Sequence, residues 1–383
     1  MSWLLVALML ADPAVRVVET GPPGSDLDSP DIPEAIEVLP ALFAEAESTV
    51  DIAQMYMLYY PPTSRGALLY RLYDAIAAAA SRGVRVRVLL DSTVLEVNPG
   101  KTHTRMPAML EELPGVEARA CDLRPFSDYS DCMMHAKYLV VDGRVAFVGS
   151  HNWSYGAMAD NRELSLEVRD AMLAGDLARV FETDWRAAGG DTAAVSPGPA
   201  REPGCGLVEV APARLRFGRP DLLAALCELA NSARRSLDIE VNSLSTRVDF
   251  GPDDRFLAVD SLLRQAAGRG ARVRLLVDRW ACDHEPGLFL GFDSLDGIEV
   301  RVADIRRAGP NPDAGTAHGK LVIADGREAL VGTATLSQRQ LVECRNVGVR
   351  VNDEETVRRL AGFFERGWNS SWTVPVSVRR QEE

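Results

Sequence analysis

The chain has 383 residues, with 42 Lys and Arg against 55 Asp and Glu, so its formal net charge is −13. Hydrophobic residues make up 46% and charged residues 25%, which excludes intrinsic disorder and fits packed domains. The acidic balance argues against a protein that binds nucleic acid through clustered Lys and Arg, although a local basic cleft is compatible with it. The length predicts two domains.

One apolar stretch, residues 3–11 (WLLVALMLA), lies near the start of the chain and is too short to span a bilayer. Residues 1–14 are therefore expected to be a signal or N-terminal segment, with a buried first strand or helix as the alternative. We expect a secreted or periplasmic protein, and the cytoplasm is the alternative location.

The chain has six cysteines, at positions 121, 132, 205, 227, 282 and 344. Cys121 and Cys132 bracket a loop short enough for a disulfide, which fits an oxidising compartment, but six reduced buried thiols are equally ordinary. No Cys or His pattern has the spacing of a zinc site, so we expect no metal and no cofactor.

The two halves of the chain repeat each other. Asp51 matches Asp238, and the segment 82–91 (RGVRVRVLLD) matches 269–278 (RGARVRLLVD) at the same offset along the chain. Each segment predicts a helix that ends at a glycine, followed by a strand whose apolar tail is covered on both faces. The repeat therefore predicts two homologous α/β domains related by a pseudo-two-fold axis, with a shared site on that axis.

The domain boundaries follow from composition. Residues 187–206 (AAGGDTAAVSPGPAREPGCG) are rich in Gly, Pro and Ala, as linkers are. We predict a first domain over residues 15–188, a linker over 189–206 and a second domain over 207–383.

A histidine and a lysine two positions apart occur in both halves. His135 and Lys137 match His318 and Lys320, at an offset slightly shorter than that of the preceding segments. In the first half the run that follows reads as strand, turn and strand, with Asp142-Gly143 as the hairpin turn. Because alternate residues of a strand share a face, the histidine and lysine of each pair point the same way.

A turn of small residues follows the second strand of each hairpin. It carries Ser150 and Asn152 in the first half and Thr333 in the second, where Thr335 stands at the position of Asn152. The full pattern, His-x-Lys-x4-Asp-x6-Gly-Ser-x-Asn, resembles the phospholipase D superfamily over nearly the whole chain. The resemblance implies two α-β-α sandwich domains with mixed sheets, whose two motifs form one site for phosphodiester chemistry.

The residue types suit that chemistry. A phosphodiester is an anion, so Lys137 and Lys320 would stabilise the charge held on its phosphoryl oxygens. A neutral histidine can attack phosphorus and form a phosphohistidine, and a protonated one can donate to the leaving oxygen. Two histidines therefore suffice for a two-step displacement without a metal.

The two copies differ at one position downstream of the histidines, where Glu163 follows His135 and Asn346 follows His318 at the same offset. The resemblance implies a carboxylate there that holds the nucleophile's other ring nitrogen. We therefore predict that Glu163 orients His135, that His135 is the nucleophile and that His318 is the general acid.

The remaining candidates have supporting roles. Ser150, Asn152, Thr333 and Asn346 are expected to bind the substrate phosphate. Asp142 and Asp325 supply the third letter of the family motif and are candidate catalytic residues, although ordering of their hairpin turns is at least as good an interpretation.

The substrate is less constrained, since the superfamily includes phospholipases D, phosphatidyl transferases and nucleases. We expect a phospholipase D that hydrolyses or transphosphatidylates phospholipids and contacts a membrane surface, because apolar segments at 54–60 and 287–292 fall near the site. A metal-independent single-strand exonuclease is the alternative, because tyrosines at 56, 59 and 60 could stack bases and the layout resembles lysosomal phospholipase D-like exonucleases and related lipases. A catalytically silent protein is disfavoured by the intact motifs, and the oligomeric state stays open.

Overall fold

The computed structural model describes residues 14–58, 66–97, 105–127, 130, 132–191, 206–212, 215, 221–246, 258–305 and 315–379. Residues 1–13, which contain the apolar segment, lie outside the described residues, so export stays a prediction.

The first half builds a seven-stranded sheet with the order β1-β7-β6-β5-β2-β3-β4. Its strands are β1 (Val15–Thr20), β2 (Thr49–Gln54), β3 (Arg85–Asp91), β4 (Val116–Cys121), β5 (Lys137–Val141), β6 (Val145–Gly149) and β7 (Glu163–Val168). Strands β2, β3 and β4 pair in parallel, and all other pairs are antiparallel.

The second half builds an eight-stranded sheet with the order β15-β11-β10-β9-β12-β13-β14-β8. Its strands are β8 (Gly206–Val210), β9 (Ser236–Val241), β10 (Arg272–Asp278), β11 (Ile298–Ala303), β12 (Lys320–Ala324), β13 (Glu328–Gly332), β14 (Asn346–Val351) and β15 (Thr373–Pro375). Apart from the added β15, strand order and direction repeat those of the first sheet, which confirms the predicted duplication and the mixed sheets.

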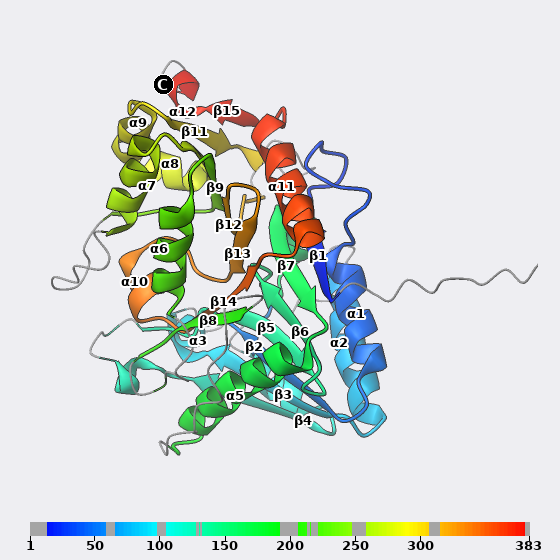
Figure 1. Ribbon diagram of the computed structural model, residues 1–383. Helices are drawn as coiled ribbons and strands as arrows, with labels where there is room; N and C mark the ends of the chain where they lie inside the picture. The colour runs from blue at the N-terminus through cyan, green and yellow to red at the C-terminus, as the bar shows by residue number, and fades with distance from the viewer. Residues whose placement is uncertain are drawn as a thin grey trace, which may run out of the picture.

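Helices cover both faces of each sheet (Figure 1). They are α1 (Ala35–Glu45), α2 (Gly66–Ser81), α3 (Ser92–Val97), α4 (Met106–Glu111), α5 (Ala171–Ala188), α6 (Leu222–Ser232), α7 (Ala258–Gly268), α8 (Arg279–His284), α9 (Pro286–Asp293), α10 (Gln338–Val342), α11 (Glu354–Asn369) and α12 (Val376–Arg379), with short 3-10 and π turns at Arg124–Phe126 and Gly156–Asp160. Each half therefore forms an α-β-α sandwich, which confirms the predicted fold.

The glycines predicted to end two helices are in place. Gly83 lies between α2 and β3 with φ of 89°, and Gly270 lies between α7 and β10 with φ of 90°. Backbone at positive φ favours glycine because it has no Cβ, so these residues end the helices and turn the chain into β3 and β10.

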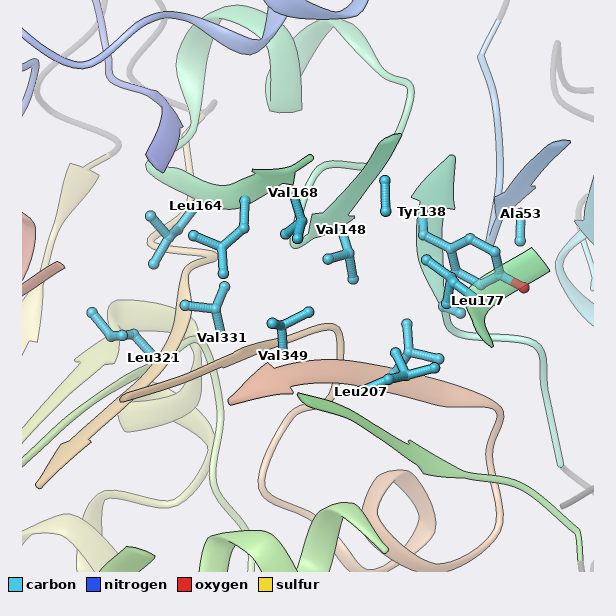
Figure 2. Close-up of a cluster of buried hydrophobic side chains, with 14 of the residues drawn as sticks. Ala53, Tyr138, Val148, Leu164, Val168, Leu177, Leu207, Leu321, Val331 and Val349 are labelled. Carbon is cyan, nitrogen blue, oxygen red and sulfur yellow. The ribbon is translucent and has the colours of Figure 1, made fainter. Parts of the chain in front are cut away.

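One hydrophobic core joins the two halves. It contains Val148 of β6 and Leu166 of β7 together with Val331 of β13 and Val349 of β14. Figure 2 shows Val148 facing Val331 and Val349 across the gap between the two sheets. Helices α5 and α11 contribute to the same core, whereas α1 and α2, and α6 and α7, cover separate outer cores. The apolar area shared at the centre fixes the two sheets against each other.

Within the described ranges, Cys121, Cys132 and Cys227 are free thiols. Cys121 and Cys132, which bracket a short loop, are both buried and are not joined by a disulfide. Within the same ranges, no helix is both long and apolar enough to cross a membrane.

Candidate active site

The two motifs occupy equivalent places in the two sheets. Lys137 is the first residue of β5 and Lys320 is the first residue of β12, and each histidine precedes its lysine by two positions. Both strands lie in the middle of their sheets, so the motifs project from the same kind of strand end in each half.

Each motif is hydrogen-bonded to the other half of the chain. The backbone N–H of His135 donates to the carbonyl of Arg345 at 3.0 Å, and the N–H of Arg345 donates to the carbonyl of Met133 at 2.9 Å. In the second motif, His318 N–H donates to the carbonyl of Arg162 at 2.8 Å. The segments that lead into β14 and β7 thus fasten the motif of the opposite domain.

The two arginines in these segments are fully buried and paired. Arg345 forms ion pairs with Asp184 at 2.8 Å and Glu209 at 2.7 Å, and Arg162 pairs with Glu240 at 2.8 Å. Removal of one partner from such a pair would leave an uncompensated buried charge. The arginines therefore hold the backbone on which the histidines depend.

His135 is held by an amide from the second half. Its Nδ1 lies 3.0 Å from Oδ1 of Asn346, which also accepts from Thr333 Oγ1 at 2.8 Å. The Asn346 Nδ2 donates to the backbone and side-chain oxygens of Gln340, which fixes the orientation of the amide. Because Oδ1 can only accept, the network assigns the proton of neutral His135 to Nδ1 and leaves a lone pair on Nε2.

His318 is held by a carboxylate from the first half. Its Nδ1 lies 2.7 Å from Oε2 of the fully buried Glu163. Burial raises the pKa of Glu163, but the charge of His318, its hydrogen bond and the charges of His151 and Lys320 outweigh burial and lower that pKa to about 2. Glu163 is therefore ionised and favours the protonated form of His318.

The predicted partnership between Glu163 and His135 is wrong. Both residues belong to the first half, but Glu163 begins β7, and its carboxylate reaches His318 of the second half. Asn346 begins β14 and reaches His135 in the same way. The pseudo-two-fold axis exchanges the partners, and an offset along the chain does not reveal that exchange.

The two histidines differ in basicity. Burial, together with the charges of Lys137 and Lys320, holds the pKa of His135 well below 6.5. Burial also lowers the pKa of His318, but the charge and hydrogen bond of Glu163 oppose that shift. His318 is therefore the histidine that better retains a proton.

The two lysines share one buried environment. Lys137 Nζ donates to the carbonyl of His135, and Lys320 Nζ donates to the carbonyl of His318 at 2.7 Å. Burial lowers the pKa of Lys320 to about 7, and burial with the charge of Lys320 lowers the pKa of Lys137 well below its usual range. The charges of Lys137 and Lys320 act on both histidines, which places the two motifs in one site, and an anion bound there would stabilise the charged lysines.

Two aspartates that the sequence reasoning missed position the motifs. Asp91 Oδ2 accepts from the N–H of Met134 at 2.6 Å, and Asp278 Oδ2 accepts from the N–H of Ala317 at 2.8 Å. Each aspartate ends a strand that is parallel to both neighbours and fixes the residue just before a histidine. The sequence signal that could have identified them is their position, because each aspartate is the last residue of the repeated segments 82–91 and 269–278.

Two of the four residues predicted to bind phosphate, Thr333 and Asn346, have their hydrogen-bond donors committed elsewhere. Ser150 Oγ accepts from the N–H of Leu164, and Thr333 Oγ1 accepts from the N–H of Val347 and donates to Asn346. The amide oxygen of Asn346 bonds to His135 and Thr333, and its amide nitrogen donates to Gln340. Thr333 and Asn346 therefore position His135, which corrects the prediction for these two, while phosphate binding through the Ser150 O–H stays a prediction.

Phosphate binding by Asn152 stays a prediction. It is buried, and its Oδ1 has no hydrogen-bond partner among the described residues. The neighbouring His151 is held inside the protein between Ser165 and Thr20, at 2.7 and 3.1 Å.

Asp142 and Asp325 are structural residues. Asp142 accepts from the backbone N–H groups of Glu47, Ser48 and Thr49, each at 2.8 Å, and Asp325 accepts equivalent bonds from residues 234–236. Both have positive φ, 51° and 56°, in the hairpin turns at the far end of the strands that begin with the two lysines. A catalytic role for either is therefore wrong, because the strand separates it from the histidines.

The apolar segments proposed as a lipid-contacting rim are internal only in part, since Leu58, Leu288 and Leu290 are half-buried. Met57 is buried, while Tyr59 and Tyr60 lie outside the described residues. Residues 287–292 belong to α9, in which Phe289 and Phe292 are buried. Within the described ranges, no group of three or more His, Cys, Asp or Glu side chains is arranged to hold a metal ion.

Comparison with known proteins agrees with this geometry. A family model described as "Cardiolipin synthase, PLD-like domain" matches residues 39–185 and again residues 226–368. These two matches cover most of the chain, which therefore belongs to the phospholipase D superfamily and is a phosphodiesterase of that class.

Relatives with different names match over most of their length. Phospholipase D Z of Dictyostelium discoideum is 24% identical, over 88% of this chain and 85% of the relative. The 5'-3' exonuclease PLD3 of Xenopus laevis is also 24% identical, over 94% of this chain and 81% of the relative. The crystal structure of phosphatidylserine synthase from Haemophilus influenzae matches with a TM-score of 0.61 and 13% identity, over 94% of this chain and 87% of that one, which shows the shared fold.

The turn-ordering role of Asp142 is testable by substitution. We expect Asp142→Ala to lower the free energy of unfolding by roughly 1–3 kcal/mol, because several hydrogen bonds are lost, and to leave kcat within a few fold. Denaturant unfolding and steady-state kinetics measure the two effects. Arg144→Ala in the same turn is the matched control and should change neither. A loss of kcat of roughly a hundredfold in a stably folded Asp142→Ala variant would restore the catalytic interpretation.

The pKa of Lys320 predicts an alkaline limit. Because the charged lysine is the competent form, kcat/KM should fall as the pH rises through about 7. The substrate for this measurement is bis(4-nitrophenyl) phosphate, whose leaving group needs no proton. Lys320→Arg should move the fall to higher pH, because arginine stays charged, even though its maximal rate is lower. An unchanged alkaline limb in Lys320→Arg would assign the limit to another group.

Proposed function

We propose that the chain cleaves phosphodiesters in two steps through a covalent phosphohistidine. The observation that carries this proposal is that Nδ1 of each histidine is engaged by a residue from the other half, Asn346 for His135 and Glu163 for His318. Nε2 of each is then the nitrogen available for chemistry, beside two lysines that can hold the phosphoryl oxygens.

His135 is the nucleophile in this proposal. Its pKa lies well below 6.5 and its Nδ1 proton is directed at Asn346, so Nε2 carries a lone pair at neutral pH. In the first step Nε2 of His135 forms a bond to phosphorus, while the bond from phosphorus to the leaving alcohol oxygen breaks.

His318 is the general acid. Ionised Glu163 supports its protonated form, and the negative charge of a bound phosphodiester supports it further. Nε2 of His318 donates its proton to the leaving oxygen. In the second step the neutral imidazole takes a proton from water or an alcohol, whose oxygen attacks phosphorus and releases His135.

A carboxylate partner also stabilises a cationic phosphohistidine, which by itself favours His318 as the nucleophile. The protonation states that the two histidines need before the first step decide which of them is the nucleophile. The acid must be protonated and the nucleophile neutral, and the lower pKa of His135 matches that order.

Labelling tests the assignment. We expect His135→Ala to abolish both turnover and the phosphoenzyme, since the attacking nitrogen is gone. His318→Ala should still trap phosphoenzyme from a nitrophenyl phosphodiester, because that leaving group needs no proton, and should be inactive on ordinary substrates. Mass spectrometry of protein quenched in alkaline denaturant, which preserves the acid-labile bond from phosphorus to nitrogen, measures the adduct. An adduct in His135→Ala and none in His318→Ala would reverse the roles.

For the substrate we propose a phospholipid, which requires contact with a membrane surface. The net charge of −13 disfavours long polyanions, and Phospholipase D Z is among the relatives that match most of the chain. A single-stranded nucleic acid is the second candidate, because relatives of equal similarity are named 5'-3' exonucleases.

Parallel assays in EDTA separate the two substrates. Phosphatidylcholine vesicles with a primary alcohol should yield choline and phosphatidyl alcohol, whereas a 5'-hydroxyl single-stranded oligonucleotide should stay intact. The His135→Ala variant is the control for contaminating activity. Stepwise shortening of the oligonucleotide without choline release would replace the phospholipid by the second candidate.

A further inference from the structure

Two buried cysteines flank the backbone contact that holds the first motif to the second half. Cys132 lies three residues before His135, and Cys344 directly precedes Arg345. The N–H of Arg345 donates to the carbonyl of Met133, and its own carbonyl accepts from the N–H of His135. Both cysteines are fully buried. Because one cysteine belongs to each half, a bond between them would join the two halves beside His135.

The side chain of Cys132 lies against the backbone that leads into Cys344. Its Sγ donates to the carbonyl of Glu343 at 3.3 Å, and the carbonyl carbon of Glu343 is bonded to the nitrogen of Cys344. The parallel bridge between Met134 and Arg345 sets the register, which places Cys132 opposite Glu343 and one residue from Cys344. With a spacing of about 4.8 Å between the two segments and a rise of about 3.3 Å per residue, the Cα atoms of the cysteines are about 6 Å apart. Disulfides have Cα separations of about 4.4–6.8 Å.

The two thiols also act on each other electrostatically. Burial raises the pKa of Cys132 well above its usual value, and the charge of Cys344 makes the largest electrostatic contribution to that rise. The pKa of Cys121 is raised by burial and by the charges of Asp184 and Asp91. The thiol that lies beside Cys132 is therefore that of Cys344, and not that of Cys121, which brackets the same short loop.

The equivalent contact at the second motif has no cysteine at either position. At the offset that relates the two motifs, Gly315 corresponds to Cys132 and Asn161 corresponds to Cys344. The backbone bridge that follows each pair joins the same two positions in both halves, which confirms that the residues are structurally equivalent. The cysteines therefore occur together at the contact that holds His135.

The position of Cys344 has a different role in the other half. There, Asn161 Nδ2 donates to Oε1 of Glu163 at 2.8 Å and so helps to orient the carboxylate that holds His318. Asn346, the counterpart of Glu163, is oriented by Gln340 instead, whose side-chain oxygen accepts from Nδ2 at 2.8 Å. Cys344 is therefore not needed to orient the partner of His135.

We propose that Cys132 and Cys344 are a redox-active pair that forms a disulfide between the two halves of the chain. The oxidant is a low-molecular-weight disulfide such as oxidised glutathione. The thiolate of one cysteine attacks a sulfur of the oxidant and releases one glutathione, and the thiolate of the other attacks the resulting mixed disulfide and releases the second. Two electrons pass from the cysteines to the oxidant, and the two protons end on the two glutathione thiols.

The disulfide would fasten covalently the contact on which His135 depends. In the reduced form, this contact is held by the backbone bonds of Arg345 and by its ion pairs with Asp184 and Glu209. A disulfide that closes a long segment restricts the unfolded chain and so stabilises the folded one. The oxidised protein should therefore keep its active site assembled at denaturant concentrations that unfold the reduced protein. This device goes beyond the proposed function and does not depend on which phosphodiester is cleaved.

Peptide mapping of the full chain tests the pairing. Folded protein is incubated in glutathione buffers of rising oxidised fraction, blocked with N-ethylmaleimide and digested without reductant. A second sample is unfolded and refolded in the same buffers, because both thiols are buried in the folded protein. We expect a cross-linked peptide pair that contains Cys132 and Cys344, formed more slowly in the folded sample. Its absence from both samples, or a link from Cys132 to Cys121, would overturn the proposal.

Denaturant unfolding measures the consequence. Oxidation should lower the equilibrium constant for unfolding by a factor of roughly 30 or more. The difference between the oxidised and reduced forms should vanish in Cys132→Ala and in Cys344→Ala. Cys227→Ala, at a half-buried position of α6, is the matched control and should keep it. Equal unfolding of the two forms in a sample whose link has been mapped would contradict the stabilising role.

Activity on bis(4-nitrophenyl) phosphate gives a separate readout. Without denaturant, the oxidised and reduced forms should have kcat values within about twofold of each other, because the folded structure already holds the two segments together. Near the unfolding midpoint of the reduced form, only the oxidised form should retain most of its activity. Loss of activity in the oxidised form without denaturant would show that the link distorts the contact at His135, and would overturn its role as a fastening.

Discussion

The hydrogen bonds that cross between the two halves at the histidines are the constraint on which the active site depends. Nδ1 of His135 bonds to Asn346, Nδ1 of His318 bonds to Glu163, and the backbone of each motif bonds to the residue just before that partner. The bonds form only if the two sheets are held in register, which the central core and the buried arginine ion pairs accomplish. Neither half contains a complete site.

The duplication makes two nearly equivalent histidines, and one substitution makes them unequal. A carboxylate stands beside His318 where an amide stands beside His135. The carboxylate favours a protonated ring, and the amide fixes a tautomer without favouring charge. A two-step displacement needs such a difference, because one ring must attack and the other must hold a proton. The same divergence between copies continues outward, where Trp153 in the first half corresponds to Leu336 in the second.

The repeat and the motif could be predicted from the sequence because both are strict patterns. The constant offsets between the halves located equivalent strands, and the hairpin around Asp142 placed His135 and Lys137 at a strand end. The partner of Glu163 could not be predicted, since its offset from the histidine of its own half fits a bond within that half or across the axis. Ser150 and Thr333 looked like phosphate ligands because their hydroxyls follow the motif. Their bonds to backbone N–H groups depend on the pairing of β6 with β7 and of β13 with β14, which only the folded structure reveals.

Titration of the histidine rings in the Glu163→Gln variant tests the crossed partnership most directly. The chain has five histidines, so selective isotope labelling and NMR can follow each ring separately, with His135→Ala and His318→Ala used to assign the signals. Loss of the carboxylate should lower the pKa of His318 further and leave that of His135 nearly unchanged, because the charge lies beside His318. A shift of His135 with an unaltered His318 would contradict the crossed partnership and return Glu163 to the histidine of its own half.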